Sequence, residues 1–222
     1  MTASVTVWAI LFAPVVLGLI AGGGMWAWAS RAGDADATAN RFKLFGQAVV
    51  PAITVLVALW AWFATPAADR AALFGGAPLE AKSLLAALGF GAAFAGLAAA
   101  ISARALRRAP ETRAFLASDV RELPSLALVA PVGEELIFRG YGAYAFSDWA
   151  LWQAALLTSA AFALMHFRPT MIALSFAFGL GLFALDRWSG TLLAPIIAHL
   201  AANLIVWLWM RRAAGPTPSV SE

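Results

Sequence analysis

Long apolar stretches dominate this sequence and limit what it can fold into. A membrane-spanning helix needs about 20 mostly apolar residues. The chain contains stretches of about this length at residues 5–29, 44–64, 83–103, 124–145, 149–166, 171–186 and 191–210. They predict an all-α fold, a polytopic transmembrane helical bundle of about seven spans that forms a single integral membrane domain over residues 1–222. An eighth span is the alternative if residues 65–82 hold a further short segment, although four charged residues there argue against it.

The scarcity of charge supports this interpretation. Only 12% of the residues are charged and 62% are hydrophobic, whereas soluble domains carry roughly 25% charged residues. Most of the surface must therefore face lipid rather than water. The chain has no cysteine, which excludes disulfides, cysteine metal ligands and a cysteine nucleophile. Residues 213–222 are rich in Pro and Ser, and we expect them to form a disordered tail.

The basic residues indicate an orientation in the membrane. A net charge of +3 could suggest nucleic-acid binding, but the Lys and Arg residues gather in the connections on one side of the predicted bundle. Eleven fall on that side, and only Arg70, Lys82 and Arg187 fall on the other. Cytoplasmic loops carry the excess of Lys and Arg. We therefore expect an integral protein of the bacterial inner membrane, with its N-terminus outside, its C-terminus in the cytoplasm and no nucleic-acid partner.

Several ionisable side chains lie inside the predicted spans. Each costs at least about 2.5–3.5 kcal/mol at the centre of a membrane helix, so their presence needs a reason. The only two histidines, His166 and His199, lie in apolar segments, and Glu134 and Glu135 are adjacent in the fourth span. Glu135 and Arg139 are four residues apart, with the acid first, and can form an ion pair. Glu134 is then the carboxylate without a local partner, a candidate general base.

Both histidines have a neighbour one helical turn away. Phe162 precedes His166 by four residues, and Asn203 follows His199 by four. An imidazole and a carboxamide that project together can polarise a carbonyl group and stabilise an oxyanion. Each feature alone has a structural explanation, such as an ion pair within one helix or polar contacts between helices. Their occurrence together, in three helices of the C-terminal half, favours a catalytic site over packing alone.

These residues form three short motifs that follow one another along the chain. Glu134 to Arg139 matches EExxxR, Phe162 to His166 matches FxxxH, and His199 to Asn203 matches HxxxN. The ordered triple resembles the CPBP family of CAAX proteases and bacteriocin-processing proteins, also called Abi, which includes the type II CAAX prenyl endopeptidases. The resemblance covers roughly residues 124–207, the expected catalytic core. It implies an intramembrane endopeptidase that hydrolyses a peptide bond of a membrane-associated or membrane-presented peptide or protein.

The resemblance also implies a role for each motif residue. Glu134, assisted by His166, activates the water, His199 and Asn203 form the oxyanion site, and Glu135, Arg139 and Phe162 support them. Members are often named metalloproteases, and Glu134, His166 and His199 are the side chains that could hold zinc, since catalytic zinc takes three protein ligands and a water. An uncharged Asn is a poor zinc ligand. We therefore favour a reaction that requires no cofactor, with one divalent metal ion as the alternative.

Two other functions are compatible with the sequence. The first is a non-catalytic membrane immunity or scaffold protein that keeps these residues for packing. The second, less favoured, is a proton-coupled transporter in which Glu134 and the histidines form a relay. Transporters are often built from inverted repeats, and no matching pair of halves is recognisable here. On the favoured interpretation the partners are membrane lipid and a peptide or protein substrate that arrives from the bilayer or the cytoplasmic side.

Overall fold

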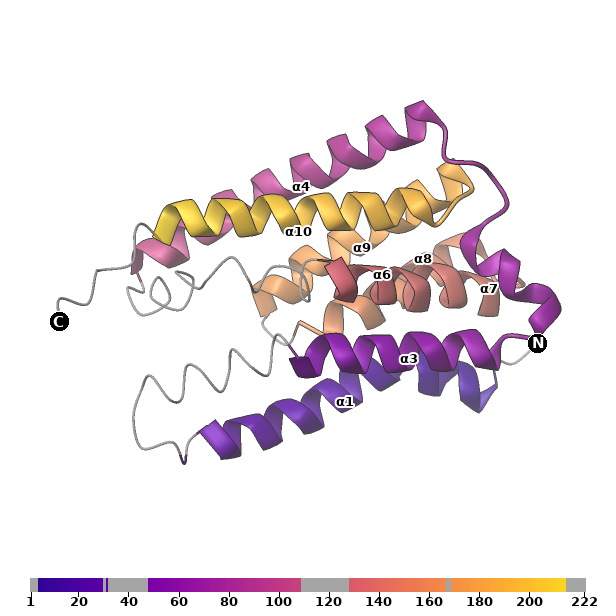
Figure 1. Cartoon of the computed structure of the whole chain (residues 1–222), viewed down its shortest axis with the longest axis horizontal. Coiled ribbons are helices and arrows are strands. Elements are labelled where there is room, and N and C mark those ends of the chain that lie inside the picture. Colours follow the sequence, from indigo (N-terminus) through magenta and orange to yellow (C-terminus); the bar gives the residue numbers. More distant parts are fainter. Residues whose placement is uncertain (1–3, 30, 32–47, 109–127, 167–168, 215–222) are drawn as a thin grey trace.

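The computed structural model describes residues 4–29, 31, 48–108, 128–166 and 169–214. Every element in these ranges is a helix and none is a strand, which confirms the all-α class. The elements, drawn in Figure 1, are α1 (Val5–Ala29), α3 (Val50–Ala64), the 3-10 helix η2 (Ala67–Phe74), α4 (Ala81–Arg108), α6 (Ala130–Glu135), the π-helix η5 (Leu136–Tyr141), α7 (Gly142–Ala145), α8 (Leu151–Leu164), α9 (Pro169–Ser189) and α10 (Leu193–Ala214).

Three of the described helices are long and apolar enough to cross a membrane. These stretches are Val5–Met25 in α1, Ala81–Ile101 in α4 and Pro169–Ser189 in α9. Shorter apolar helices lie at Val50–Ala64, Leu151–Leu164 and Leu193–Trp209, and the fourth predicted span is divided into α6, η5 and α7. The chain is thus a helical membrane protein, and the count of seven spans stays a prediction. α1 begins at one end of the bundle and α10 finishes at the other, as an odd number of crossings requires (Figure 1).

Two helix boundaries differ from the sequence-based ranges. α9 begins at Pro169, two residues before the predicted span, because proline is well tolerated in the first turn of a helix. α10 includes Ala213 and Ala214, which the sequence had placed in the disordered tail. The remainder of that predicted tail, 215–222, lies outside the described residues. η2 falls in the region considered for an eighth span, and its eight residues are too few to cross a bilayer.

Small residues bring α4 and α10 unusually close together. Each helix presents a small buried residue at every fourth position: Ser83, Ala87, Gly91 and Ala95 on α4, and Ala194, Ala198 and Ala202 on α10. In membranes such rows let helix backbones approach one another. A Cβ atom on Gly91 would lie 3.2 Å from the carbonyl carbon of Ala198 and closer still to its oxygen. The helix that carries His199 is therefore positioned directly by α4.

Two connections meet at the end of the bundle where α1 begins. The backbone nitrogen of Ala77 donates to the carbonyl oxygen of Gly190 (3.1 Å), and that of Leu192 donates to Phe74 (2.9 Å). Gly75 and Gly190 have φ values of 71° and 68°, a left-handed conformation that glycine adopts without strain. These contacts place the connections that carry Arg70, Lys82 and Arg187 at one end of the bundle, as the count of basic residues required.

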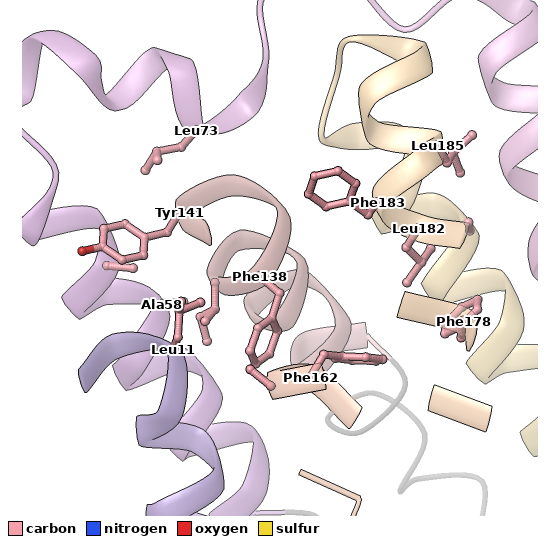
Figure 2. Close-up of a cluster of buried hydrophobic side chains, with 14 of the residues drawn as sticks. Leu11, Ala58, Leu73, Phe138, Tyr141, Phe162, Phe178, Leu182, Phe183 and Leu185 are labelled. Carbon is pink, nitrogen blue, oxygen red and sulfur yellow. The ribbon is translucent and has the colours of Figure 1, made fainter. Parts of the chain in front are cut away.

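The core lies between the segment formed by α6, η5 and α7 and its neighbours α8 and α9. Phe138 and Phe162 meet edge to face with ring centroids 5.7 Å apart, and Figure 2 shows the two rings side by side. Phe178 and Leu182 extend this apolar core along α9 (Figure 2). Four polar side chains of the three motifs, those of Glu134, Glu135, Arg139 and His199, are buried in this layer.

Candidate active site

Glu135 is the centre of a buried polar cluster. Its side chain has no exposed surface, and its Oε1 lies 2.8 Å from Nδ1 of His199 on α10. Arg139 donates from Nη1 to the same oxygen at 3.3 Å, and its Nε lies 3.3 Å from Oε2. The ion pair predicted from the four-residue spacing is therefore confirmed. The contact with His199 was not predicted, because the two residues are 64 positions apart.

Arg139 is held from several directions in addition to Glu135. Its Nη2 donates to the backbone oxygen of Gly179 on α9 at 3.0 Å, and its guanidinium lies 4.6 Å from the ring centroid of Phe162. A Cβ at Gly179 would stand 3.0 Å from Nη2 and 3.0 Å from Cβ of Ser159, so the approach depends on glycine. A buried charge is tolerated when it is paired and hydrogen-bonded, and Arg139 meets that requirement.

Glu134 faces the other nitrogen of the same imidazole. Its Oε2 lies 3.7 Å from Nε2 of His199, slightly beyond hydrogen-bond distance. The residue is 8% exposed, whereas Glu135 is completely buried. His199 thus lies between two adjacent carboxylates, tightly bound to Glu135 and loosely opposed to Glu134. Among the described residues, the structure gives Glu134 no closer charged partner.

His166 lies just after the end of α8, beside the cluster. Its ring centroid is 5.3 Å from that of Phe162, and it is close enough to Glu134 and His199 to interact with their charges. Its Nδ1 is buried and has no hydrogen-bond partner of good geometry among the described residues, although the backbone of Phe162 and Ala163 lies close to the ring. An unpaired buried polar atom needs an explanation, and one is a water molecule bound there. The second histidine therefore belongs to the same site.

Among the motif residues, Asn203 has the fewest contacts with the other members of the site. It lies one turn after His199 on α10 and is half-buried. No hydrogen bond joins its side chain to another described residue. The four-residue spacing does place it on the same side of α10 as His199, so its predicted role stays a prediction.

Two residues near the cluster were missed by sequence reasoning. Phe178 on α9 contacts the ring of His199 edge to face at 5.2 Å; it belongs to no motif, and only its place in an apolar helix could have suggested burial. Asp186, the last residue of the predicted span 171–186, is 2% exposed and paired with Arg187. It is close enough to Glu135 and Arg139 to interact with both charges.

The site offers a poor set of metal ligands. Within the described part of the chain, no three His, Asp or Glu side chains converge in a way that could hold an ion. Nδ1 of His199 is already bonded to Glu135, and Asn203 is an uncharged amide. The predicted zinc ligands Glu134, His166 and His199 do lie near one another, so dependence on a metal ion is a question for a chelation experiment.

The fold and the site together define a helical membrane protein with a buried glutamate, histidine and arginine cluster. Residues 117–205 match the family described as type II CAAX prenyl endopeptidase Rce1-like, so this part of the chain is similar to that family. The match confirms the resemblance found in the three motifs, and similarity to this family suggests a protease. No curated protein and no solved structure matches the chain.

Proposed function

We propose that the protein is an intramembrane endopeptidase in which Glu134 activates the attacking water. The difference between the two adjacent carboxylates carries this proposal. Glu135 is paired with Arg139 and His199, whereas the nearest charged partner of Glu134 among the described residues is Nε2 of His199, at 3.7 Å. A general base needs a free oxygen within reach of the proton that it removes. Glu134 is 8% exposed and can be reached by a water molecule, whereas Glu135 is completely buried against Arg139 and His199.

The remaining residues would act around the same carbonyl group. Glu134 takes a proton from water while the water oxygen bonds to the carbonyl carbon, and His166, whose Nδ1 has no hydrogen-bond partner among the described residues, helps to orient that water. His199 donates through Nδ1 to Glu135, so its Nε2 can donate to the developing oxyanion, together with Asn203, when the imidazole carries both protons. When the C–N bond breaks, the proton on Glu134 passes to the leaving amine. No step in this sequence requires a metal ion.

Glu135, Arg139 and Phe162 would hold the site without contacting the substrate. Glu135 bonds His199, Arg139 bonds Glu135, and the ring of Phe162 touches both His199 and the guanidinium. Because these groups are completely or almost completely buried, their arrangement changes little between substrate and transition state. Such preorganised dipoles stabilise developing charge without reorganisation at the moment of reaction.

An apolar groove beside the proposed site is consistent with a substrate that is associated with the membrane. A cavity of about 570 Å³ lies between α3, η2 and the beginning of the fourth helix, lined by Val55, Ala58, Leu59, Trp62, Phe74, Leu128, Val129, Val132, Gly133 and Leu136. Val132 and Leu136 lie two positions before and after Glu134 and so project from the opposite side of the helix. The groove therefore borders the catalytic helix on its far face, where an apolar part of the substrate could rest while its peptide bond approaches from the bilayer or the cytoplasm.

The proposed location follows from the same features. The basic end of the bundle would lie in the cytoplasm of a bacterium, with the N-terminus outside the inner membrane. Arg70, Lys82 and Arg187 would then lie at the outer surface. Reporter fusions at the two termini measure this directly: a periplasmic reporter should be active only at the N-terminus.

The test of the activity is cleavage of a quenched fluorescent peptide library by purified protein in lipid nanodiscs. Wild type would be compared with Glu134→Gln and His166→Ala, each with and without a strong chelator. Glu80→Gln is the matched control, because Glu80 is an exposed carboxylate paired with Lys82. We expect cleavage by wild type and the control and none by Glu134→Gln. Cleavage that survives Glu134→Gln would refute the mechanism, and loss of cleavage on chelation would show that a metal ion is required.

A further inference from the structure

His199 is enclosed by two phenyl rings that stand perpendicular to it. Phe162 contacts it from α8, with ring centroids 5.6 Å apart and an interplanar angle of 87°. Phe178 contacts it from α9, at 5.2 Å and 88°. Edge-to-face contacts at this separation are favourable beyond the area that they bury. The two rings belong to different helices, so each is held in place independently of the other.

One hydrogen bond is not enough to fix the direction of the imidazole. The bond from Nδ1 to Glu135 holds one atom of the ring, and the terminal torsion of a histidine side chain is broad. The ring could therefore tilt about Nδ1 and move Nε2 away from Glu134. Perpendicular phenyl rings on two sides block that motion, because tilting would drive the imidazole into one of them.

Phe178 is supported in turn by α4. Its ring stacks on Phe94, with centroids 4.1 Å apart and an interplanar angle of 22°, and on Phe90 at 5.5 Å and 13°. Phe90 lies against Gly181, where a Cβ would collide with its ring. Phe178 is 4% exposed, so it has little freedom to move. A continuous row of rings therefore runs from α4 to His199.

We propose that Phe178, supported by Phe94, is a positioning residue that directs Nε2 of His199 toward the reacting carbonyl. This role rests on the function proposed above for His199. Phe178 lies outside the three motifs, and Phe94 lies outside the matched region 117–205. The part of the chain that precedes the matched region thereby contributes to the geometry of the catalytic site.

The direct test is a spectrum of the histidine rings. The chain has two histidines, so a histidine-labelled sample in nanodiscs gives signals from two rings, which His166→Ala assigns. Phe178→Leu removes the ring while keeping an apolar side chain of similar reach. We expect the ring signals of His199 to move and those of His166 to stay. This measurement does not depend on proteolysis, so it distinguishes failure of this role from failure of the proposed function.

The kinetic arm uses a control on the same helix. Phe183 is equally buried, at 3%, and among the described ring contacts none joins it to His199; Figure 2 shows both rings on α9. Phe178→Leu should lower kcat by about 10- to 100-fold, as expected for a misplaced catalytic group, with KM within about twofold because His199 contacts the oxyanion only in the transition state. Phe183→Leu should keep kcat within about twofold of wild type when corrected for folded protein.

Phe94→Leu examines the supporting ring. It should move the His199 signals and lower kcat in the same direction as Phe178→Leu, but to a smaller extent. Unchanged His199 signals in Phe178→Leu would overturn the positioning role, and so would moved signals with an unchanged kcat. A Phe94→Leu variant identical to wild type would overturn the contribution of α4.

Discussion

Gly91 offers the sharpest test of how α4 and α10 determine the site. A Cβ at this position would lie 3.1 Å from Cβ of Ala201 and 3.2 Å from the carbonyl carbon of Ala198, and nearer still to that carbonyl oxygen. Ordinary contacts begin at 3.4 Å. A backbone carbonyl inside a helix cannot rotate away, so the two helices must separate by roughly 1 Å in an interior with few voids. Ala198 directly precedes His199, and the imidazole of His199 would move with it.

Gly91→Ala should therefore affect both stability and activity. Overpacking of this kind typically costs about 1–3 kcal/mol, partly offset by the gain of about 1 kcal/mol that Ala has over Gly in a helix. A misplacement of roughly 1 Å at a catalytic group can reduce the rate about 100-fold. Unfolding by denaturant can be followed by the fluorescence of the ten tryptophans, and cleavage by the peptide assay described above.

The same helix supplies a matched control. Gly89 is exposed, and a Cβ there would meet no atom within 4 Å. Gly89→Ala should leave the cleavage rate unchanged and raise the free energy of unfolding slightly, by up to about 1 kcal/mol. A Gly91→Ala protein as stable and as active as Gly89→Ala would refute the conclusion that close packing with α4 determines the position of His199.

Two further substitutions test other parts of the structure. Arg139→Met leaves the buried carboxylate of Glu135 without its cation and should lower the free energy of unfolding by about 3–5 kcal/mol. Adding Glu135→Gln to this variant should recover part of the lost stability. A double variant no more stable than Arg139→Met would contradict the contribution of the ion pair. Gly75→Ala places a side chain at a φ of 71° and against the backbone of Gly190. It should cost at least about 1–3 kcal/mol, whereas Gly76→Ala, in open space, should be nearly neutral in the same unfolding experiment.

Local spacing accounts for what the sequence predicted correctly. Stretches of about 20 apolar residues gave the helices and the membrane class, since length and hydropathy are properties of one segment. The pairing of Glu135 with Arg139 was predictable because both residues are on consecutive turns of one helix. The assignment of all seven motif residues to one neighbourhood came from their resemblance to a family, and the structure brings six of them into mutual contact or electrostatic range. Asn203 is the exception.

Contacts between distant helices account for what the sequence left out. The hydrogen bond from His199 to Glu135 joins α10 to α6, and no periodicity in either segment indicates which carboxylate faces which nitrogen. The division of the fourth predicted span, 124–145, into α6 and the π-helix η5 likewise has no local signal in the sequence. Phe178 would be read as one more apolar residue in a membrane helix. Its role depends on the crossing of α9 with α10, which is set by the packing of the whole bundle.

The segment that matches the family does not build its site alone. Thr54 of α3 packs against Gly133, where a Cβ would lie 2.7 Å from its methyl group, and this contact holds the helix immediately before Glu134. Gly91 of α4 determines how closely α10 approaches, and Phe94 stacks on the ring that flanks His199. All three lie before residue 117, where the match begins. The motif residues would supply the chemistry under the proposed function, and the preceding helices determine how closely those residues approach one another.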